Sequence, residues 1–186
     1  MPKVYVFMAK GFEEMELVIS VDMLRRAGVE VQTVSLSSNR EPVLGSRNIP
    51  IVPDLTIEQV DVQSCDLLLL PGGVEGTKNL AGNEKVLAYL KDADRRGKFL
   101  AAICAGPTVL VRAGLVEGRR MTSHPGVREK MKGVSYQESR VVIDGRFITS
   151  RAAGTTFEFA LAIVETLIGK GKTAEINKGV LAKVED

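Results

Sequence analysis

The stretch from residue 98 to residue 107, Lys-Phe-Leu-Ala-Ala-Ile-Cys-Ala-Gly-Pro, constrains the fold more than any other part of the chain. Its first six residues are mostly apolar and short, as is typical of a strand that is buried on both faces. Gly106 and Pro107 then interrupt this pattern, and the residues from Thr108 onward read as the start of a helix. We therefore expect Cys104 to lie where a central strand turns sharply into a helix.

The residues around Cys104 have the spacing of a nucleophile elbow. Ala102 and Gly106 stand two positions before and two positions after the cysteine, and both are small. Small residues are needed there because the turn brings the strand and helix backbones close together. The free N–H groups at the start of the helix would favour a thiolate. The stretch alone leaves an inert, buried cysteine equally open.

Strand-like and helix-like segments alternate through most of the chain. This alternation predicts an α/β fold, in which a mostly parallel sheet lies between two layers of helices. We expect one domain over residues 1–186. The expected strands are 4–9, 29–36, 67–70, 98–103 and a hairpin of 140–144 with 146–150, with short irregular strands within 43–52. The expected helices are 13–26, 55–60, 79–80, 83–96, 108–113, 126–132, 155–168 and 173–181. In the helix over 155–168, we expect Phe157, Leu161, Val164 and Leu167 or Ile168 to form the buried stripe.

Composition excludes several classes of protein. The 25 basic and 23 acidic residues are well mixed and give a net charge of +2, so no specific nucleic-acid binding is expected. No apolar run approaches the ~18 residues of a membrane span, and the N-terminus lacks a signal-peptide pattern. Two cysteines do not make a disulfide framework, which favours a reducing, cytoplasmic location. A single histidine with two distant cysteines gives no reason to expect a metal site.

The first helix holds an unusual carboxyl, that of Glu16, flanked by Met15 and Leu17. One interpretation is a solvated glutamate in the first turn. The other is a carboxyl that apolar neighbours hold near the strand ends with a raised pKa. Residues 17–24 are apolar on more than one face, so this helix is expected to be covered on two sides. A homodimer that uses the second side is a reasonable hypothesis.

Three further positions complete a possible thiol site. Gly72 and Gly73 follow the buried strand 67–70 and allow a close approach of backbone at its carboxyl end. His124 is the chain's only histidine, although a plain turn residue is equally compatible with its surroundings. Cys65 precedes the strand 67–70 and is interpreted as structural or superficial.

These parts permit two chemistries. In one, Cys104 attacks a carbonyl, Glu16 and His124 transfer protons, and the N–H groups of Gly73 and Ala105 stabilise the oxyanion. In the other, the Cys104 thiolate is oxidised to a sulfenic and then a sulfinic acid, and the same groups hold the product. Both use the same residues, so the sequence does not separate an enzyme from a redox sensor.

The chain resembles the ThiJ/PfpI (DJ-one/PfpI) superfamily, and within it the parkinsonism-associated deglycases, almost from end to end. The matching runs are residues 9–16, 22–28, 70–73, 101–107, 122–125, 149–151 and 154–165. The resemblance implies a flavodoxin-like three-layer α/β/α sandwich and a homodimer built partly on the first helix. It implies Cys104 as the nucleophile, Glu16 as its protonated partner and His124 nearby. Gly73 and Ala105 would be the oxyanion donors, and Arg47 and Arg151 would line the pocket.

The activities that the resemblance implies need no cofactor and no metal. They are the glutathione-independent conversion of methylglyoxal or glyoxal to a 2-hydroxy acid, a lyase activity of the lactate dehydratase type, and the hydrolytic repair of glycated adducts. A chaperone role and an oxidative-stress response are also implied. Our first hypothesis is therefore a Cys104-dependent glyoxalase or deglycase, and the alternative is a non-catalytic redox sensor and chaperone.

The chain departs from the family pattern at several positions. Ala152 and Ala153 stand where relatives usually carry Gly-Pro, next to Arg151. Gly45 and Val52 replace two cysteines, which leaves fewer alternative oxidation sites. Ala105, rather than histidine, follows the nucleophile, so a peptidase with adjacent cysteine and histidine is not supported.

Overall fold

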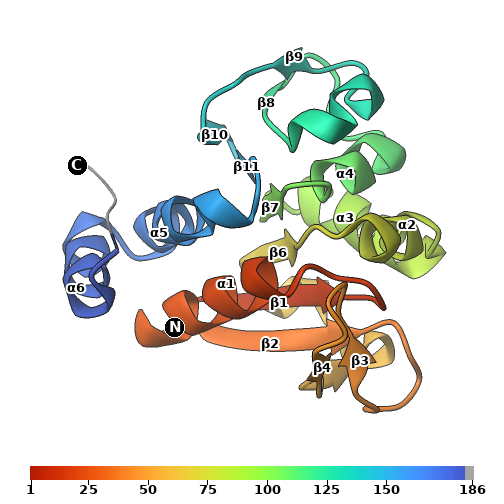
Figure 1. Cartoon of the computed structure of the whole chain (residues 1–186), viewed down its shortest axis with the longest axis horizontal. Coiled ribbons are helices and arrows are strands. Elements are labelled where there is room, and N and C mark those ends of the chain that lie inside the picture. The colour runs from red at the N-terminus through yellow and green to blue at the C-terminus, as the bar shows by residue number, and fades with distance from the viewer. Residues whose placement is uncertain (183–186) are drawn as a thin grey trace.

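The computed structural model describes residues 1–182, and residues 183–186 of the expected domain lie outside the described part. A seven-stranded sheet forms its centre, in the order β10-β11-β7-β6-β1-β2-β5 (Figure 1). Only the pairing of β10 with β11 is antiparallel in this sheet. The strands are β1 (Lys3–Met8), β2 (Glu30–Ser35), β5 (Leu55–Thr56), β6 (Leu67–Leu70), β7 (Phe99–Ile103), β10 (Val141–Asp144) and β11 (Phe147–Ser150).

Helices cover both faces of the sheet. The helices α1 (Glu14–Arg26), α5 (Thr156–Leu167) and α6 (Lys170–Val180) pack on one face. The helices α2 (Val74–Ala81), α3 (Glu84–Arg95) and α4 (Pro107–Ala113) pack on the other. The expected flavodoxin-like, mostly parallel three-layer α/β/α sandwich is confirmed.

The two cores follow from the alternation of side chains along each strand. Leu68 and Leu70 of β6 belong to the core under α3 and α4, whereas Leu67 and Leu69 belong to the core under α1 and α5. All four leucines are fully buried. A strand that is apolar at every position fits only where both faces are covered, which explains why Leu67–Leu70 was predictable.

Two small sheets lie outside the central one. They are β3 (Val43–Leu44) with β4 (Pro50–Ile51), and β8 (Arg120–Met121) with β9 (Ser135–Tyr136). Single-turn or short 3₁₀ segments complete the described chain at Ile57–Gln59, Val62–Ser64, Pro125–Lys130 and Ala153–Thr155. None of the described helices is long and apolar enough to cross a membrane.

Three expectations about elements were wrong in part. The segment 55–60 is a two-residue strand, β5, followed by one 3₁₀ turn rather than a helix, because Leu55 and Thr56 pair with β2. Helix α2 begins at Val74, five residues before the expected start at residue 79. Phe157 of α5 is 39% exposed, because the helix turns Phe159, Ala160 and Ile163 towards the sheet instead.

Candidate active site

Cys104 lies directly after β7, in the sharp turn that leads into α4. Its φ is +63°, in the left-handed region that residues with side chains rarely adopt. Hydrogen bonds fix this conformation: its N–H donates to the Ser150 carbonyl at 3.0 Å, and its carbonyl accepts from the His124 N–H at 2.9 Å. A Cβ at Gly106 would lie 2.5 Å from the Leu70 carbonyl oxygen, so the small residue expected after the cysteine is required.

Glu16 brings a carboxyl to the cysteine from the first turn of α1. Its side chain is fully buried, so the interpretation of a solvated first-turn glutamate was wrong. The Gly72 N–H donates to Glu16 Oε2 at 2.7 Å, while Oε1 has no hydrogen-bond partner among the described residues. A Cβ at Gly72 would lie 2.5 Å from Glu16 Oε2 and 3.0 Å from Cys104 Sγ. The glycine thus leaves room for the carboxyl and the thiol to meet.

The pair of Glu16 and Cys104 holds protons unusually strongly. Burial raises the pKa of Glu16 to about 7, and this outweighs the hydrogen bonds from the Cys104 thiol and the Gly72 N–H, which lower it. Burial, and then the charge of the adjacent Glu16, raise the pKa of Cys104 to about 12. The expected N–H donors to the sulfur, from Ala105 and Gly73, are present but do not outweigh these effects. At neutral pH the thiol therefore keeps its proton beside a carboxyl that is ready to accept it.

A cavity of about 390 Å³ opens beside the thiol, a volume suited to a small ligand. Five of the expected site residues contribute to its lining, namely Arg47, Gly73, Cys104, Ala105 and His124. Six lining residues were not predicted, namely Gly11, Glu13, Ser46, Val74, Glu75 and Val127. Of these six, only Glu13 had a signal in the sequence, namely its place among the acidic residues at the start of the first helix.

Three expected site residues do not line this cavity. Glu16 is fully buried beside Cys104. Gly72 lies behind it, where its N–H holds Glu16. Arg151 lies elsewhere, because its Nη1 donates to the Glu138 carbonyl at 2.8 Å. The expectation that Arg151 lines the pocket is therefore not met in this structure.

The backbone geometry of Gly73 is as constrained as that of Cys104. Its φ is +95°, and a Cβ there would lie 2.1 Å from the Gly11 carbonyl oxygen. No other residue type fits a position this crowded in this conformation. The loop before α2 is consequently fixed, and the Gly73 N–H points at the sulfur of Cys104.

His124 lies at the exposed edge of the cavity. Its Nδ1 accepts a hydrogen bond from the Gly126 N–H at 3.0 Å, so the neutral ring carries its proton on Nε2. In this tautomer the free side of the ring is a hydrogen-bond donor. His124 is suited to holding an oxygen atom of a ligand by a hydrogen bond, rather than to accepting a proton.

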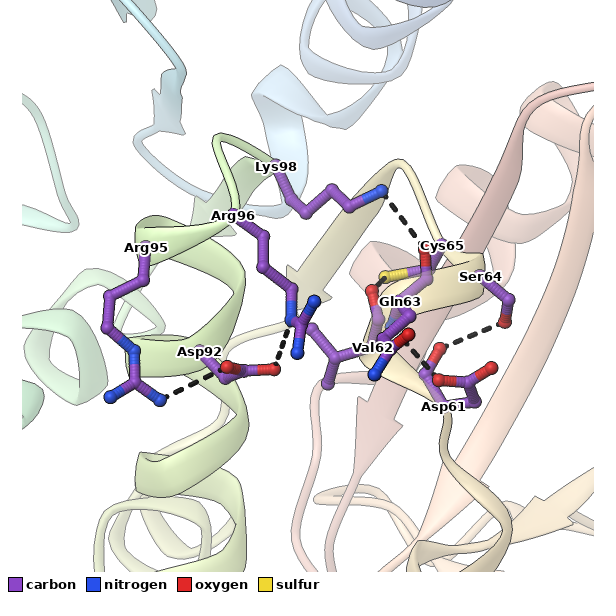
Figure 2. A network of polar contacts seen from close by, with 9 residues as sticks. All are labelled: Asp61, Val62, Gln63, Ser64, Cys65, Asp92, Arg95, Arg96 and Lys98. Atoms are coloured by element: carbon purple, nitrogen blue, oxygen red, sulfur yellow. Dashed lines mark hydrogen bonds and ion pairs between the residues drawn. The ribbon is translucent and has the colours of Figure 1, made fainter.

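Cys65, the second cysteine, has no part in the cavity. It is fully buried, and its thiol donates to the Val62 carbonyl at 3.4 Å. Figure 2 shows it among polar contacts of its neighbours, in which Lys98 donates to the Gln63 carbonyl and Asp92 binds Arg95 and Arg96. Burial raises the pKa of Cys65 to about 11, which fits the structural role expected for it.

The described residues contain no group of three or more histidine, cysteine, aspartate or glutamate side chains that could hold a metal ion. The site instead offers a thiol and backbone N–H donors at the cavity, with the buried Glu16 carboxyl behind the thiol. This is a set of groups for nucleophilic attack on a carbonyl with proton transfer.

Comparisons with known proteins show which family this chain resembles along its length. A model of the DJ-1/PfpI family matches residues 2–166. The Parkinson disease protein 7 homolog of Danio rerio is 46% identical over 182 residues, which cover 96% of each chain. The glutathione-independent glyoxalase DJR-1.2 of Caenorhabditis elegans is 41% identical over 89% of this chain and 88% of its own. The crystal structure of Drosophila melanogaster DJ-1beta matches with a TM-score of 0.95 and 40% identity, over 98% of this chain and 99% of that one.

Proposed function

Because this chain belongs to the DJ-1/PfpI family, we propose that it is a glutathione-independent glyoxalase that converts 2-oxoaldehydes such as methylglyoxal into 2-hydroxy acids. The observation that carries the proposal is the buried Glu16 carboxyl against the Cys104 thiol, with its pKa raised to about 7. A carboxyl with this pKa is matched to proton transfer near neutral pH. A relative that is 41% identical is named as such a glyoxalase.

The reaction would begin at the sulfur. Cys104 Sγ attacks the aldehyde carbon, a C–S bond forms, and the thiol proton passes to the Glu16 carboxylate. The carbonyl electron pair moves onto its oxygen, next to the N–H groups of Gly73 and Ala105, which stabilise that charge. The oxygen then takes the proton from Glu16, which gives a hemithioacetal and restores the carboxylate.

The second stage moves hydrogen between the two carbons of the substrate. Glu16 removes the hydrogen of the former aldehyde carbon as a proton, and the electron pair forms an enediolate with its charge on the oxygen of the neighbouring carbon. Glu16 returns the proton to that neighbouring carbon, and the hydroxyl proton of the former aldehyde carbon passes to the neighbouring oxygen, which gives a thioester. One carbon is thus oxidised as the other is reduced. Water hydrolyses the thioester, which releases the 2-hydroxy acid and the Cys104 thiol. No external oxidant or cofactor enters this balance.

The same attack extends to glycated adducts. Where the aldehyde has already added to an amine, Sγ displaces the amine from the same carbon, the thiol proton passes by way of Glu16 to the departing amine nitrogen, and the later steps are unchanged. We include such deglycase activity in the proposal, with small aldehydes and their adducts as the substrates.

We further propose that the protein works as a homodimer in the cytoplasm. Met15 and Val18, on α1, are 54% and 47% exposed, which is a high exposure for large apolar side chains on a helix that also packs on the sheet. Ile49 and Val52 are exposed as well, at 53% and 58%. A partner subunit that covers these side chains would remove apolar surface from water. The free thiols of Cys65 and Cys104 suit a reducing compartment.

The decisive experiment measures lactate from methylglyoxal without glutathione, in a buffer that contains no amine. Wild type is compared with Cys104→Ala, and Cys65→Ala serves as the matched control. Lactate enriched in one enantiomer, formed by wild type and by Cys65→Ala but not by Cys104→Ala, is the expected result. Equal amounts of racemic lactate from all three proteins would refute the proposed enzymatic activity.

One observation favours a redox sensor as the second candidate. Glu16 Oε1 has no hydrogen-bond partner among the described residues, and the N–H groups of Gly73 and Ala105 already point at the sulfur. A sulfinic acid at Cys104 would find a donor in the protonated carboxyl and in both N–H groups. Rapid addition of two oxygen atoms to Cys104 by dilute peroxide, in a protein without turnover, is the outcome that would favour this function.

A further inference from the structure

Glu14 is a buried carboxyl that the reaction above does not use. It belongs to the first turn of α1, as Glu16 does, and only 5% of it is exposed. Its Oε1 accepts hydrogen bonds from the Arg47 N–H at 2.5 Å and from the Ile49 N–H at 3.5 Å, and its Oε2 accepts from the Ser46 hydroxyl at 3.0 Å. One side chain thus binds three residues of the segment 45–49, which we name the wall loop.

The wall loop is packed closely around this carboxyl. A Cβ at Gly45 would lie 2.3 Å from Glu14 Oε1, so only glycine leaves space for the contact. The loop closes on itself through a hydrogen bond from the Gly45 N–H to the Ile49 carbonyl at 3.1 Å. The Ser46 N–H also donates to the Phe12 carbonyl at 2.7 Å. A further hydrogen bond runs within the loop from the Asn48 N–H to the Gly45 carbonyl at 3.1 Å, and Glu14 adds contacts to three of its residues.

The wall loop forms one side of the cavity next to Cys104. Ser46 and Arg47 both line it, and Arg47 is the only lysine or arginine among its described lining residues. The Arg47 side chain is exposed, and within residues 1–182 the only hydrogen bond of its guanidinium is to the Ser46 carbonyl at 3.1 Å. Since this partner belongs to the same loop, the place of the guanidinium over the cavity depends on where the Arg47 backbone lies.

Glu14 carries its negative charge at neutral pH. Burial acts to raise the pKa of Glu14, but hydrogen bonds from Arg47, Ser46 and Ile49 outweigh it, so the pKa lies below its usual value. The other titratable groups that line the cavity are Cys104, His124 and the carboxyls of Glu13 and Glu75, with Lys10 paired to Glu75. Glu14 therefore holds the wall loop in the same way across the neutral pH range, and its contacts do not change with pH there.

We propose that Glu14 is a positioning residue, which fixes the wall loop so that Arg47 presents its positive charge to the cavity and to the oxygen atoms of the bound substrate. The part that concerns substrate rests on the proposed glyoxalase function. The part that concerns the charge near Cys104 does not depend on it. The two parts are tested separately.

The first test measures the charge near the thiol without any turnover. Cys104 is alkylated with iodoacetate, which is negatively charged, and with iodoacetamide, which is neutral, and the two rates are compared by mass spectrometry. Loss of the Arg47 charge is expected to lower the ratio of the iodoacetate rate to the iodoacetamide rate about three- to tenfold. Glu14→Ala should lower this rate ratio as much as Arg47→Ala does, and the double variant should show no lower ratio than either single variant.

Conservative and control variants complete this test. Glu14→Gln should keep the ratio within about twofold of wild type, because an amide oxygen still accepts from the two N–H groups and the amide nitrogen can donate to Ser46. Glu58→Ala removes an exposed carboxylate paired with Lys85, away from the cavity, and should change nothing. If Glu14→Ala does not fold, Glu14→Asp, which is one methylene shorter, should lower the ratio in the same direction.

The second test uses methylglyoxal kinetics. Glu14→Ala should raise KM about tenfold and change kcat less than about threefold, because Arg47 contributes to binding and not to the proton transfers. A folded Glu14→Ala, or failing that Glu14→Asp, with the alkylation ratio of wild type would overturn the positioning role. A wild type without turnover would refute the glyoxalase instead, and the alkylation ratio would still decide the role of Glu14.

Discussion

The amide nitrogen of Gly72 lies 2.7 Å from Oε2 of Glu16, and the space that a side chain at Gly72 would need is already taken by that carboxyl oxygen. A backbone donor and a missing side chain thus hold the carboxyl beside the thiol. Four predictions follow from this contact, from the titration of Glu16 and from the exposed face of α1.

The rate of the reaction should depend on pH through Glu16. Its carboxylate is the base, so kcat/KM should rise about tenfold per pH unit at low pH and level off above about pH 7, where the carboxyl has lost its proton. Glu16→Gln should lower kcat/KM by about 10²- to 10⁴-fold and abolish this rise. Initial rates from about pH 5 to pH 9 provide the measurement. A wild-type rate that stays flat over this range would exclude Glu16 as the titrating base.

The same carboxyl should cost stability at neutral pH. The pKa of Glu16 is about 7 in the folded chain, against 4.5 as the reference value, so the folded state binds more protons between these two values. Stability should therefore fall as pH rises from about 4.5 to 7, by up to about 3 kcal/mol. Glu16→Gln carries no charge, so its advantage in free energy of unfolding over wild type should grow across this window. Urea titrations at about pH 4.5 and pH 8 measure it, and an equal difference at both pH values would contradict the prediction.

Gly72→Ala should displace the carboxyl. The new methyl group would lie 2.5 Å from Glu16 Oε2 and 2.6 Å from the Cys104 Cβ, so the loop or the glutamate must move. We expect a loss of about 1–3 kcal/mol in stability and a large fall in kcat. Gly171→Ala, where nothing lies within 4 Å of the added Cβ, is the matched control. Thermal unfolding measures the change in stability, and initial rates measure the change in kcat. A Gly72→Ala variant as active and as stable as wild type would mean that the contact between Gly72 and Glu16 is unimportant.

The exposed apolar face of α1 should mediate dimer formation. Val18 is 47% exposed on this helix, and an aspartate in its place would bring a charge into the proposed interface. We expect Val18→Asp to be a monomer at micromolar concentration while wild type is a dimer, as measured by sedimentation equilibrium. Ile143→Asp, which changes a residue that is 45% exposed on β10, should leave the dimer intact. A monomeric wild type would remove the homodimer from the proposal.

Most of the fold was predictable because its signals are local. Leu67–Leu70 is apolar at every position and short, and the structure forms β6 from these same residues. The start of α2 was not predictable, because Gly72, Gly73 and Gly76 look like loop residues in the sequence. In the structure a Cβ at Gly76 would lie 2.7 Å from the Phe12 nitrogen, so this helical glycine serves a close contact with a distant segment.

The thiol could be placed from the sequence, but the separate roles of the nearby glutamates and the wall loop could not. Small residues on both sides of Cys104 are a pattern that can be read within five residues. Glu13, Glu14 and Glu16 look alike as acidic residues in a first helical turn, yet each has a different role. Glu13 caps the helix through the Glu16 N–H at 2.8 Å, and Glu14 binds a loop more than 30 residues away. Only the tertiary structure separates them.

The floor of the cavity is made largely of backbone, whereas its edge is made of side chains. Gly72, Gly73 and Cys104 have no freedom to vary, since each is fixed by a contact or by a strained φ. Val74, which is 80% exposed, and Val127, which is partly exposed, carry no such constraint. In evolution or in protein engineering, the reacting groups are therefore expected to stay unchanged together. Substrate preference can instead be altered by substitutions at a few positions on the edge of the cavity.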